Sequence, residues 1–351
     1  MCVARSKPCW SGSARAVPQD PFGTTLDLRG WRANTPCLPV LHLLNGDTTR
    51  AGLERSGLPG EFLAWTDVLY EGPVPHDPGT ESFRQARARY LAEAGYGSRD
   101  VILRGLRHQD HLLAGSQGYD EIVLWLEHDL FDQLLLVRHL EWLSRHPSAA
   151  SRVQLIQSSR YLGPMSPEEL AAMYPGRAPV TPLQVASGTE AWRAVCADSP
   201  ATLERLVRDG PQPELPYLHG ALTRLLEEYP STSCGLSRSE RQILRALRDG
   251  HHTFEDCFCA TQRMEDRIFM GDSSFIHLAR GLAGARQPLL TFDDDGRSCP
   301  EHKAEMGLTD LGEDVLAGDT DHIRVNGIDR WIGGVHLVGN DAKWRWDDRT
   351  A

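Results

Sequence analysis

Residues 121–145 read EIVLWLEHDLFDQLLLVRHLEWLSR, and this stretch decides the fold class. Its first six residues form an almost wholly apolar run, which is typical of a strand buried in a sheet. From Leu130 to Arg145 the apolar residues recur with helical spacing. Between the strand and the helix stand Glu127, His128 and Asp129. A buried strand followed directly by a long helix indicates an α/β fold.

The same alternation of strands and helices extends to both sides of this stretch. We predict further strands at 39–44, 61–65 and 152–157, and helices at 48–56, 80–95 and 99–116. Strands that alternate with helices indicate an open, mainly parallel sheet with helices on its faces. We assign this α/β domain, with its candidate ligand site, to residues 39–160.

The segments on either side of this domain differ in pattern. Residues 1–38 lack hydrophobic periodicity and the apolar segment of a secretory signal, so we expect a disordered tail or an upstream start that is not used. Residues 161–235 carry helix-start signals, such as Ser166-Pro-Glu-Glu169, and no strand signals, which predicts a helical region and a linker. Residues 319–351 hold three of the nine tryptophans, and we expect this aromatic segment to pack back on the protein.

Residues 236–318 show three helical patterns followed by a hairpin pattern, the order of a winged helix-turn-helix. The first helix begins with the capping box Ser237-Arg-Ser-Glu240, and the third, at 272–284, stands where a recognition helix would be. The segment has ten Arg and Lys against fifteen Asp and Glu, a net charge of −5. This balance disfavours DNA as a partner, although the winged-helix-like pattern leaves DNA contact through 236–318 open.

The composition of the whole chain excludes some classes of protein. The 351 residues carry a net charge of −11, which argues against broad non-specific binding of nucleic acid. No apolar run approaches the length of a membrane span, so we expect no membrane partner. The eight cysteines are scattered and form neither a zinc pattern nor a disulfide framework, which favours reduced thiols in a cytoplasmic protein. The oligomeric state is left open.

Carboxylates follow three of the four predicted strands. In an open α/β sheet, ligands bind outside the carboxyl ends of the strands, and these ends meet at one edge. We therefore expect a pocket there, built by candidate catalytic residues that follow the strands: Asp47, Asp67, Glu71, Glu127, His128 and Asp129. Candidate substrate-binding residues at the same strand ends are Asn45, Gly46, Thr48 and Trp65, with Gly46 allowing a close approach of the backbone.

Such a pocket suits one of three kinds of chemistry. Clustered carboxylates hold Mg²⁺ or Mn²⁺, which makes these ions the candidate cofactors. They also divide acid and base roles through mutually shifted pKa values. Lastly, clustered carboxylates bind a cationic or polyhydroxylated ligand. In each case His128 would be a general base or a metal ligand.

Structural roles compete with these functional ones. Asp47 precedes a helix and could serve only as its N-cap. Asp129 followed by Asp132 also has the pattern of a cap with a first-turn carboxylate. Asp67 and Glu71 lie in a Gly/Pro-rich stretch, where a solvated loop is the simple alternative. The hypothesis of a site therefore rests on the convergence of these residues and not on a single motif.

Five strings of the sequence, in order, resemble those of a bacterial family known as domain of unknown function 1835. They are LHLLNGD at 41–47, WTDVLYEGPVP at 65–75, LWLEHDLFDQ at 124–133, GLSRSE at 235–240 and NGIDRWIGGVHL at 326–337. The resemblance covers about 39–346. It implies that Gln133, Asp329 and Arg330 join the substrate-binding set, with the residues of the last string reaching back to the strand-end pocket.

Two hypotheses of function follow. The first is an enzyme, a metal-assisted hydrolase or group transferase, acting on a small polar or phosphorylated substrate at the strand ends. The alternative is a ligand-sensing transcriptional regulator or adaptor that uses the winged helix to contact DNA or a protein. Both predict a small-molecule ligand in the α/β domain.

Overall fold

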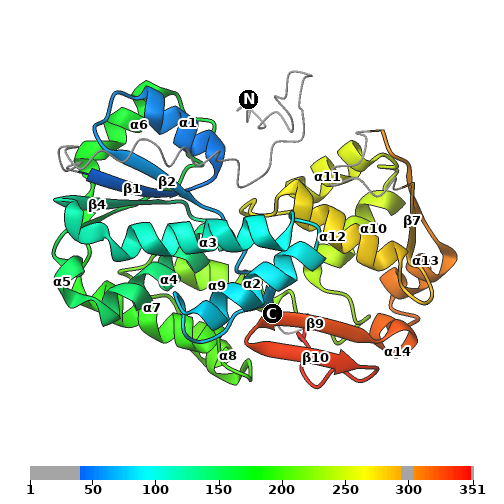
Figure 1. Cartoon of the computed structure of the whole chain (residues 1–351). Coiled ribbons are helices and arrows are strands. Elements are labelled where there is room, and N and C mark those ends of the chain that lie inside the picture. The colour runs from blue at the N-terminus through cyan, green and yellow to red at the C-terminus, as the bar shows by residue number, and fades with distance from the viewer. Residues whose placement is uncertain (1–39, 294–302, 349–351) are drawn as a thin grey trace.

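The structure is a computed structural model that describes residues 40–293 and 303–348. The predicted tail at 1–38 therefore lies outside the described residues. The chain folds into a mixed α/β structure with a mostly parallel main sheet, as the sequence predicted (Figure 1).

The main sheet has five strands, and the four predicted ones are confirmed. Their order is β2-β1-β4-β5-β6, where β2, β1, β4 and β5 run parallel and β6 is antiparallel to β5. The strands are β1 (Val40–Asn45), β2 (Glu61–Trp65), β4 (Glu121–Leu126), β5 (Val153–Gln157) and β6 (Ala178–Pro179). The short β6 corrects the expectation that 161–235 contains no strand, because its two residues pair with the edge of β5 through backbone contacts that no side-chain pattern announces.

Helices cover both faces of this sheet. Between the strands lie α1 (Asp47–Arg55), α2 (Glu81–Glu93), α3 (Arg99–Ala114), α4 (Leu130–Arg145) and α5 (Pro147–Ala150). They are followed by α6 (Pro167–Met173), α7 (Pro182–Val195), α8 (Ala201–Arg208) and α9 (Leu218–Leu226). Helices α1 and α6 lie together on one face, and α4 lies on the other (Figure 1).

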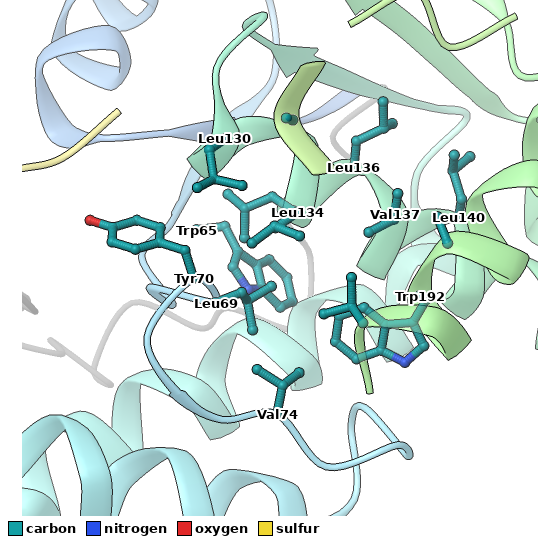
Figure 2. Close-up of a cluster of buried hydrophobic side chains, with 14 of the residues drawn as sticks. Trp65, Leu69, Tyr70, Val74, Leu130, Leu134, Leu136, Val137, Leu140 and Trp192 are labelled. Carbon is teal, nitrogen blue, oxygen red and sulfur yellow. The ribbon is translucent and has the colours of Figure 1, made fainter. Parts of the chain in front are cut away.

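Helix α4 is the centre of the largest hydrophobic core. It is buried on most sides because it packs between the sheet and helices α7 and α9. Figure 2 shows Leu134 of α4 beside the indole of Trp65 of β2, while Val137 and Leu140 of the same helix lie on the side of Trp192 of α7. The helices of 161–235 thus share one core with the α/β segment, and the predicted boundary near residue 160 does not separate two hydrophobic cores.

A second core lies within the C-terminal helices. It is enclosed by α10 (Arg238–Arg248), α11 (Phe254–Arg263), α12 (Asp272–Ala283), the antiparallel strands β7 (Leu290–Phe292) and β8 (Met306–Leu308), and α13 (Asp310–Ala317). The predicted capping box at the start of α10 is present, with Ser237 and Glu240 each bonding the other's backbone N–H.

The aromatic C-terminal segment returns to the first half of the chain. After α14 (His322–Asn326), strands β9 (Ile328–Gly333) and β10 (Val335–Gly339) form a hairpin, and β9 pairs in parallel with the short β3 (Gly72–Pro73). Gly333 has φ 59°, and a Cβ there would lie 2.2 Å from a backbone oxygen at the end of α7, so only glycine fits. Trp344 and Trp346 pack against the large core.

No helix in the described parts of the chain is both long enough and apolar enough to span a bilayer.

Candidate functional site

The carboxyl ends of β1 and β4 define a topological switch point in the sheet. From β1 the chain crosses to β2 on one side, whereas β4 lies on the other side of β1. Connections that diverge in this way leave a crevice between the two strand ends, where α/β proteins bind ligands. Here Asn45 ends β1 and Glu127 comes directly after β4, so both residues stand at this switch point.

Three buried carboxylates meet at this switch point. Glu127, Asp129 and Asp132 each offer an oxygen atom, and these atoms all lie within 4.8 Å of one another. Their exposed fractions are 8%, 4% and 0%. Within residues 40–293 and 303–348 they are the one group of three such side chains close enough to share a metal ion. The sequence pattern predicts Glu127 and Asp129 as site residues but places Asp132 only in the first turn of the helix.

Asp132 links the two strand ends. One oxygen accepts a hydrogen bond from the backbone N–H of Glu127 at 2.9 Å, and the other accepts one from the Asn45 amide at 2.7 Å. Burial raises the pKa of Asp132 to about 6, although both hydrogen bonds act to lower it. The other two carboxylates also organise the backbone, since Asp129 caps α4 by accepting from the N–H of Asp132, and Glu127 accepts from the N–H of Leu162 at 2.7 Å.

Gln133 lies directly beneath this loop. Its side chain is fully buried, and its amide nitrogen donates to the backbone oxygen of Glu127 at 2.7 Å. Its amide oxygen has no hydrogen-bond partner among the described residues. Gln133 therefore fixes the position of the Glu127 backbone from below.

His128 is partly buried beside the cluster, between two tyrosines. Its ring centroid lies 4.8 Å from that of Tyr161 and 6.0 Å from that of Tyr217. Its backbone oxygen accepts a hydrogen bond from the Arg267 guanidinium at 3.0 Å, and the hydroxyl of Tyr161 accepts one from the N–H of Ile268. The loop between α11 and α12 thus contacts the strand-end site.

The sequence pattern does not predict these neighbours of His128. Tyr161, Tyr217 and Arg267 come from segments predicted as helices or linkers, and no spacing relates them to residues 127–129. They meet His128 only because the chain folds back on itself, with Arg267 standing 139 residues further along.

Asp47 is not one of the three clustered carboxylates, and Thr48 follows it in the first turn of α1. Both are exposed, and Asp47 makes an ion pair of 3.1 Å with Arg50 on its own helix. The expectation that Asp47 caps α1 is wrong, because the N-cap is Gly46 and no side chain bonds the first turn. Gly46 has φ 80°, which glycine adopts without strain and which starts the helix one residue earlier than predicted.

Asp67 and Trp65 are structural. Asp67 is 1% exposed and forms a 2.8 Å ion pair with Arg87, which corrects the alternative of a solvated loop. The same guanidinium donates to three backbone oxygens of the β2–α2 connection, so the pair clamps that loop onto α2. The ring of Trp65 is buried, with the guanidinium of Arg138 4.1 Å above it and His139 at its edge.

Glu71, Asp329 and Arg330 belong to a different region. The Glu71 carboxylate accepts hydrogen bonds from Tyr96 at 3.0 Å and Tyr90 at 3.4 Å. Arg330 pairs with Glu240 of α10, and Asp329 pairs with His336 across the β9–β10 hairpin. The expectation that these tail residues reach the strand-end pocket is therefore wrong: pairing with β3 holds β9 near Glu71.

The three carboxylates have the chemistry of a site for a hard divalent cation. Mg²⁺ and Mn²⁺ prefer carboxylate and carbonyl oxygens, and a carboxylate oxygen that accepts one hydrogen bond keeps a second lone pair. Glu127, Asp129 and Asp132 would then be the ligands, and His128 lies outside this group.

No protein-family model matches the chain, and no curated protein matches its sequence.

Proposed function

We propose that the protein is a divalent-metal-dependent enzyme, a hydrolase or group transferase, that acts on a small polar or phosphorylated substrate. The observation that carries this proposal is the position of three buried carboxylates at the switch point between β1 and β4. Three negative charges in a buried site are costly unless a cation or a proton compensates them. A bound Mg²⁺ or Mn²⁺ would neutralise them and polarise a phosphoryl or carbonyl oxygen of the substrate.

The residues around the cluster have separable roles in this proposal. Glu127, Asp129 and Asp132 hold the ion, while Asn45 and the N–H of Glu127 fix the Asp132 carboxylate between the strand ends. His128, partly buried beside the cluster, takes a proton from the attacking water or hydroxyl as a general base.

We further propose that the C-terminal helices, residues 236–318, form a winged helix that contacts the rest of this chain and not DNA. The expected recognition helix is α12. Its Ser274 hydroxyl is hydrogen-bonded to Tyr70 at 2.7 Å and to Tyr96 at 2.6 Å, so this face of α12 is already occupied. A regulator that reads DNA with α12 would have to break these contacts.

We also propose membership of the family known as domain of unknown function 1835, and a cytoplasmic location.

Metal binding tests the main proposal directly. We would titrate the protein with Mn²⁺ and follow the free ion by electron paramagnetic resonance, then repeat the titration with Glu127→Gln, Asp129→Asn and Asp132→Asn. Asp47→Asn is the matched control, because Asp47 follows the neighbouring strand β1 but is exposed and outside the cluster. We expect one site in the wild type and in the control, with affinity at least tenfold weaker in each cluster variant.

A second measurement identifies the substrate class. A thermal-shift screen with nucleotides and sugar phosphates, with Mn²⁺ present, detects any compound that binds the folded state. A compound that stabilises the wild type but not His128→Ala would place the substrate beside His128. Absence of Mn²⁺ binding to the folded wild type at millimolar concentration, or equal losses in Asp47→Asn and Asp132→Asn, would exclude the metal site.

A further inference from the structure

A large open cleft lies between α2, α12, α14 and the β9–β10 hairpin. Its volume is about 1190 Å³, enough for a ligand of drug size. Figure 1 shows the four elements that surround it. Among the described residues, those that line the cleft do not include Glu127, Asp129 or Asp132. It is therefore a second site, separate from the proposed metal centre.

Two guanidinium groups line this cleft. Arg330 of β9 bonds Glu240 through one terminal nitrogen, and its other N–H groups have no hydrogen-bond partner in the described parts of the chain. Arg89 of α2 stands exposed at the rim, with no carboxylate partner within residues 40–293 and 303–348. A guanidinium offers five N–H donors in a planar fork, which suits a carboxylate or a phosphate.

Neutral polar groups stand beside Arg330. The Tyr90 hydroxyl lies 3.4 Å from the Glu71 carboxylate and 3.5 Å from Nε2 of His277. Burial lowers the pKa of His277 and of His322, and it raises the pKa of Tyr90 far above its ordinary value. At neutral pH the cleft therefore presents uncharged imidazoles and a protonated phenol, which do not repel an anion.

The carboxylates of the cleft are mostly compensated. Glu240 is held by Arg330 and by the N–H of Ser237, and Asp329 is bonded to His336 at 2.7 Å. Glu93, at the end of α2, is exposed to solvent, where salt screens its charge. Two of the three lining carboxylates are thus paired with basic side chains, and the Glu71 carboxylate, which is outside the lining, lies 3.4 Å from the Tyr90 hydroxyl.

The rest of the wall is apolar and aromatic. Val74, Leu278 and Ile323 line the cleft, and the indole of Trp331 stacks on the ring of His336 with centroids 4.3 Å apart. Such a surface suits a flat apolar body placed beside the charged group.

We propose that this cleft binds a small organic anion, with its carboxylate or phosphate on Arg330 and its apolar body along Leu278 and Trp331. The site and its ligand class go beyond the proposed metal chemistry and do not depend on it.

Displacement of a fluorescent anion tests the proposal. Anilinonaphthalene sulfonate, an aromatic anion, is bound to the full-length protein and then displaced by naphthoate, naphthyl phosphate or naphthol, which share one aromatic body. We expect naphthoate or naphthyl phosphate to displace the probe at concentrations at least tenfold lower than naphthol, which is uncharged at neutral pH. The better of the two anions distinguishes a carboxylate ligand from a phosphate ligand.

Variants locate the binding. The double variant Glu240→Gln with Arg330→Gln removes the guanidinium without leaving a buried charge alone. In this variant, we expect the anions and naphthol to displace the probe at about equal concentrations. Trp331→Ala should lower the affinity of the cleft for all three naphthyl ligands severalfold. Leu183→Ala is the control, because Leu183 is 61% exposed on α7 and lies outside the cleft. Glu127→Gln should leave displacement unchanged, which separates this site from the metal site.

Three results would overturn the proposal. The first is equal displacement by naphthol and by both anions in the wild type, a comparison that needs no variant to fold. The second is a Trp331→Ala protein that melts as the wild type does and binds every ligand unchanged. The third is a loss of probe binding in Leu183→Ala.

Discussion

Replacing Glu240 by Gln tests the ion pair that joins the C-terminal helices to the β9–β10 hairpin. Glu240 is buried near the start of α10, where one carboxylate oxygen contacts Arg330 and the other accepts from the N–H of Ser237 at 2.8 Å. Burial by itself raises the pKa of this carboxyl. The charge of Arg330, the charge that His322 carries at acid pH, and the two hydrogen bonds outweigh burial and lower the pKa from 4.5 to about 2.

The pKa of Glu240 sets the size and sign of the effect. The difference between 4.5 and about 2, at about 1.4 kcal/mol for each pH unit, corresponds to a contribution on the order of 3 kcal/mol at pH 7. Because the pKa is lower in the folded state than in the unfolded state, this contribution is complete above pH 4.5. It is lost as the pH falls from 4.5 to about 2.

Urea unfolding followed by circular dichroism measures this contribution. Gln does not titrate, and it keeps a side chain that completes a capping box, so the substitution removes mainly the charge. We expect Glu240→Gln to lower the free energy of unfolding by about 3 kcal/mol at pH 7 and by about 1.4 kcal/mol at pH 3. Adding Arg330→Gln should restore part of the loss, since the single variant leaves a guanidinium without its carboxylate.

The expected cost depends on the burial of Glu240. Glu54→Gln is the control, because Glu54 is exposed on α1 and lies 3.9 Å from Arg50, so its charge should matter little. A cost of less than about 1 kcal/mol at pH 7 for Glu240→Gln, or a cost that is the same at pH 7 and pH 3, would refute the assigned role of the ion pair.

Three further predictions concern other parts of the chain. Asp67→Asn should lower the free energy of unfolding by about 3–5 kcal/mol, since it leaves the buried Arg87 without its partner; chemical denaturation measures this, and a loss below about 1 kcal/mol would contradict it. Asp132→Asn should weaken Mn²⁺ binding yet raise the melting temperature at pH 7. Because the pKa of Asp132 is raised from 3.8 to about 6 in the folded state, the free energy of unfolding falls as the pH rises through this range and stays lowered at pH 7; a lower melting temperature of the variant at pH 7 would count against this. Gly333→Ala should expose the β9–β10 hairpin to limited proteolysis, whereas Gly281→Ala, where a Cβ meets nothing within 4 Å, should be cut no faster than the wild type.

The local elements of this fold could be predicted from the sequence because their signals are short-range. The strand at Glu121–Leu126 and the helix at Leu130–Arg145 have the predicted bounds, since an apolar run and a helical period are properties of neighbouring residues. The capping boxes that begin at Ser166, Thr181 and Ser237 also formed as their residue types indicate.

The candidate site could be predicted only in part. The strand-end rule correctly brought Asn45 and Glu127 to one edge, because parallel strands carry their carboxyl ends to the same side. It also selected Asp47 and Asp67, which lie after strands but are exposed or paired with Arg87. A rule that places a residue near an edge does not fix the direction of its side chain or its partner.

The sequence by itself determined the four parallel strands of the main sheet, the helices between them, and the position of Glu127 and Asp129 directly after β4. Only the tertiary structure decided which carboxylates meet. Asp132 joins Glu127 and Asp129 because Asn45, 87 residues earlier, holds its other oxygen, and Glu71 turns instead toward Tyr96 and α12. The physical reason is that periodicity and capping act over about four residues, whereas the partners of a buried charge are set by packing between segments far apart in the chain.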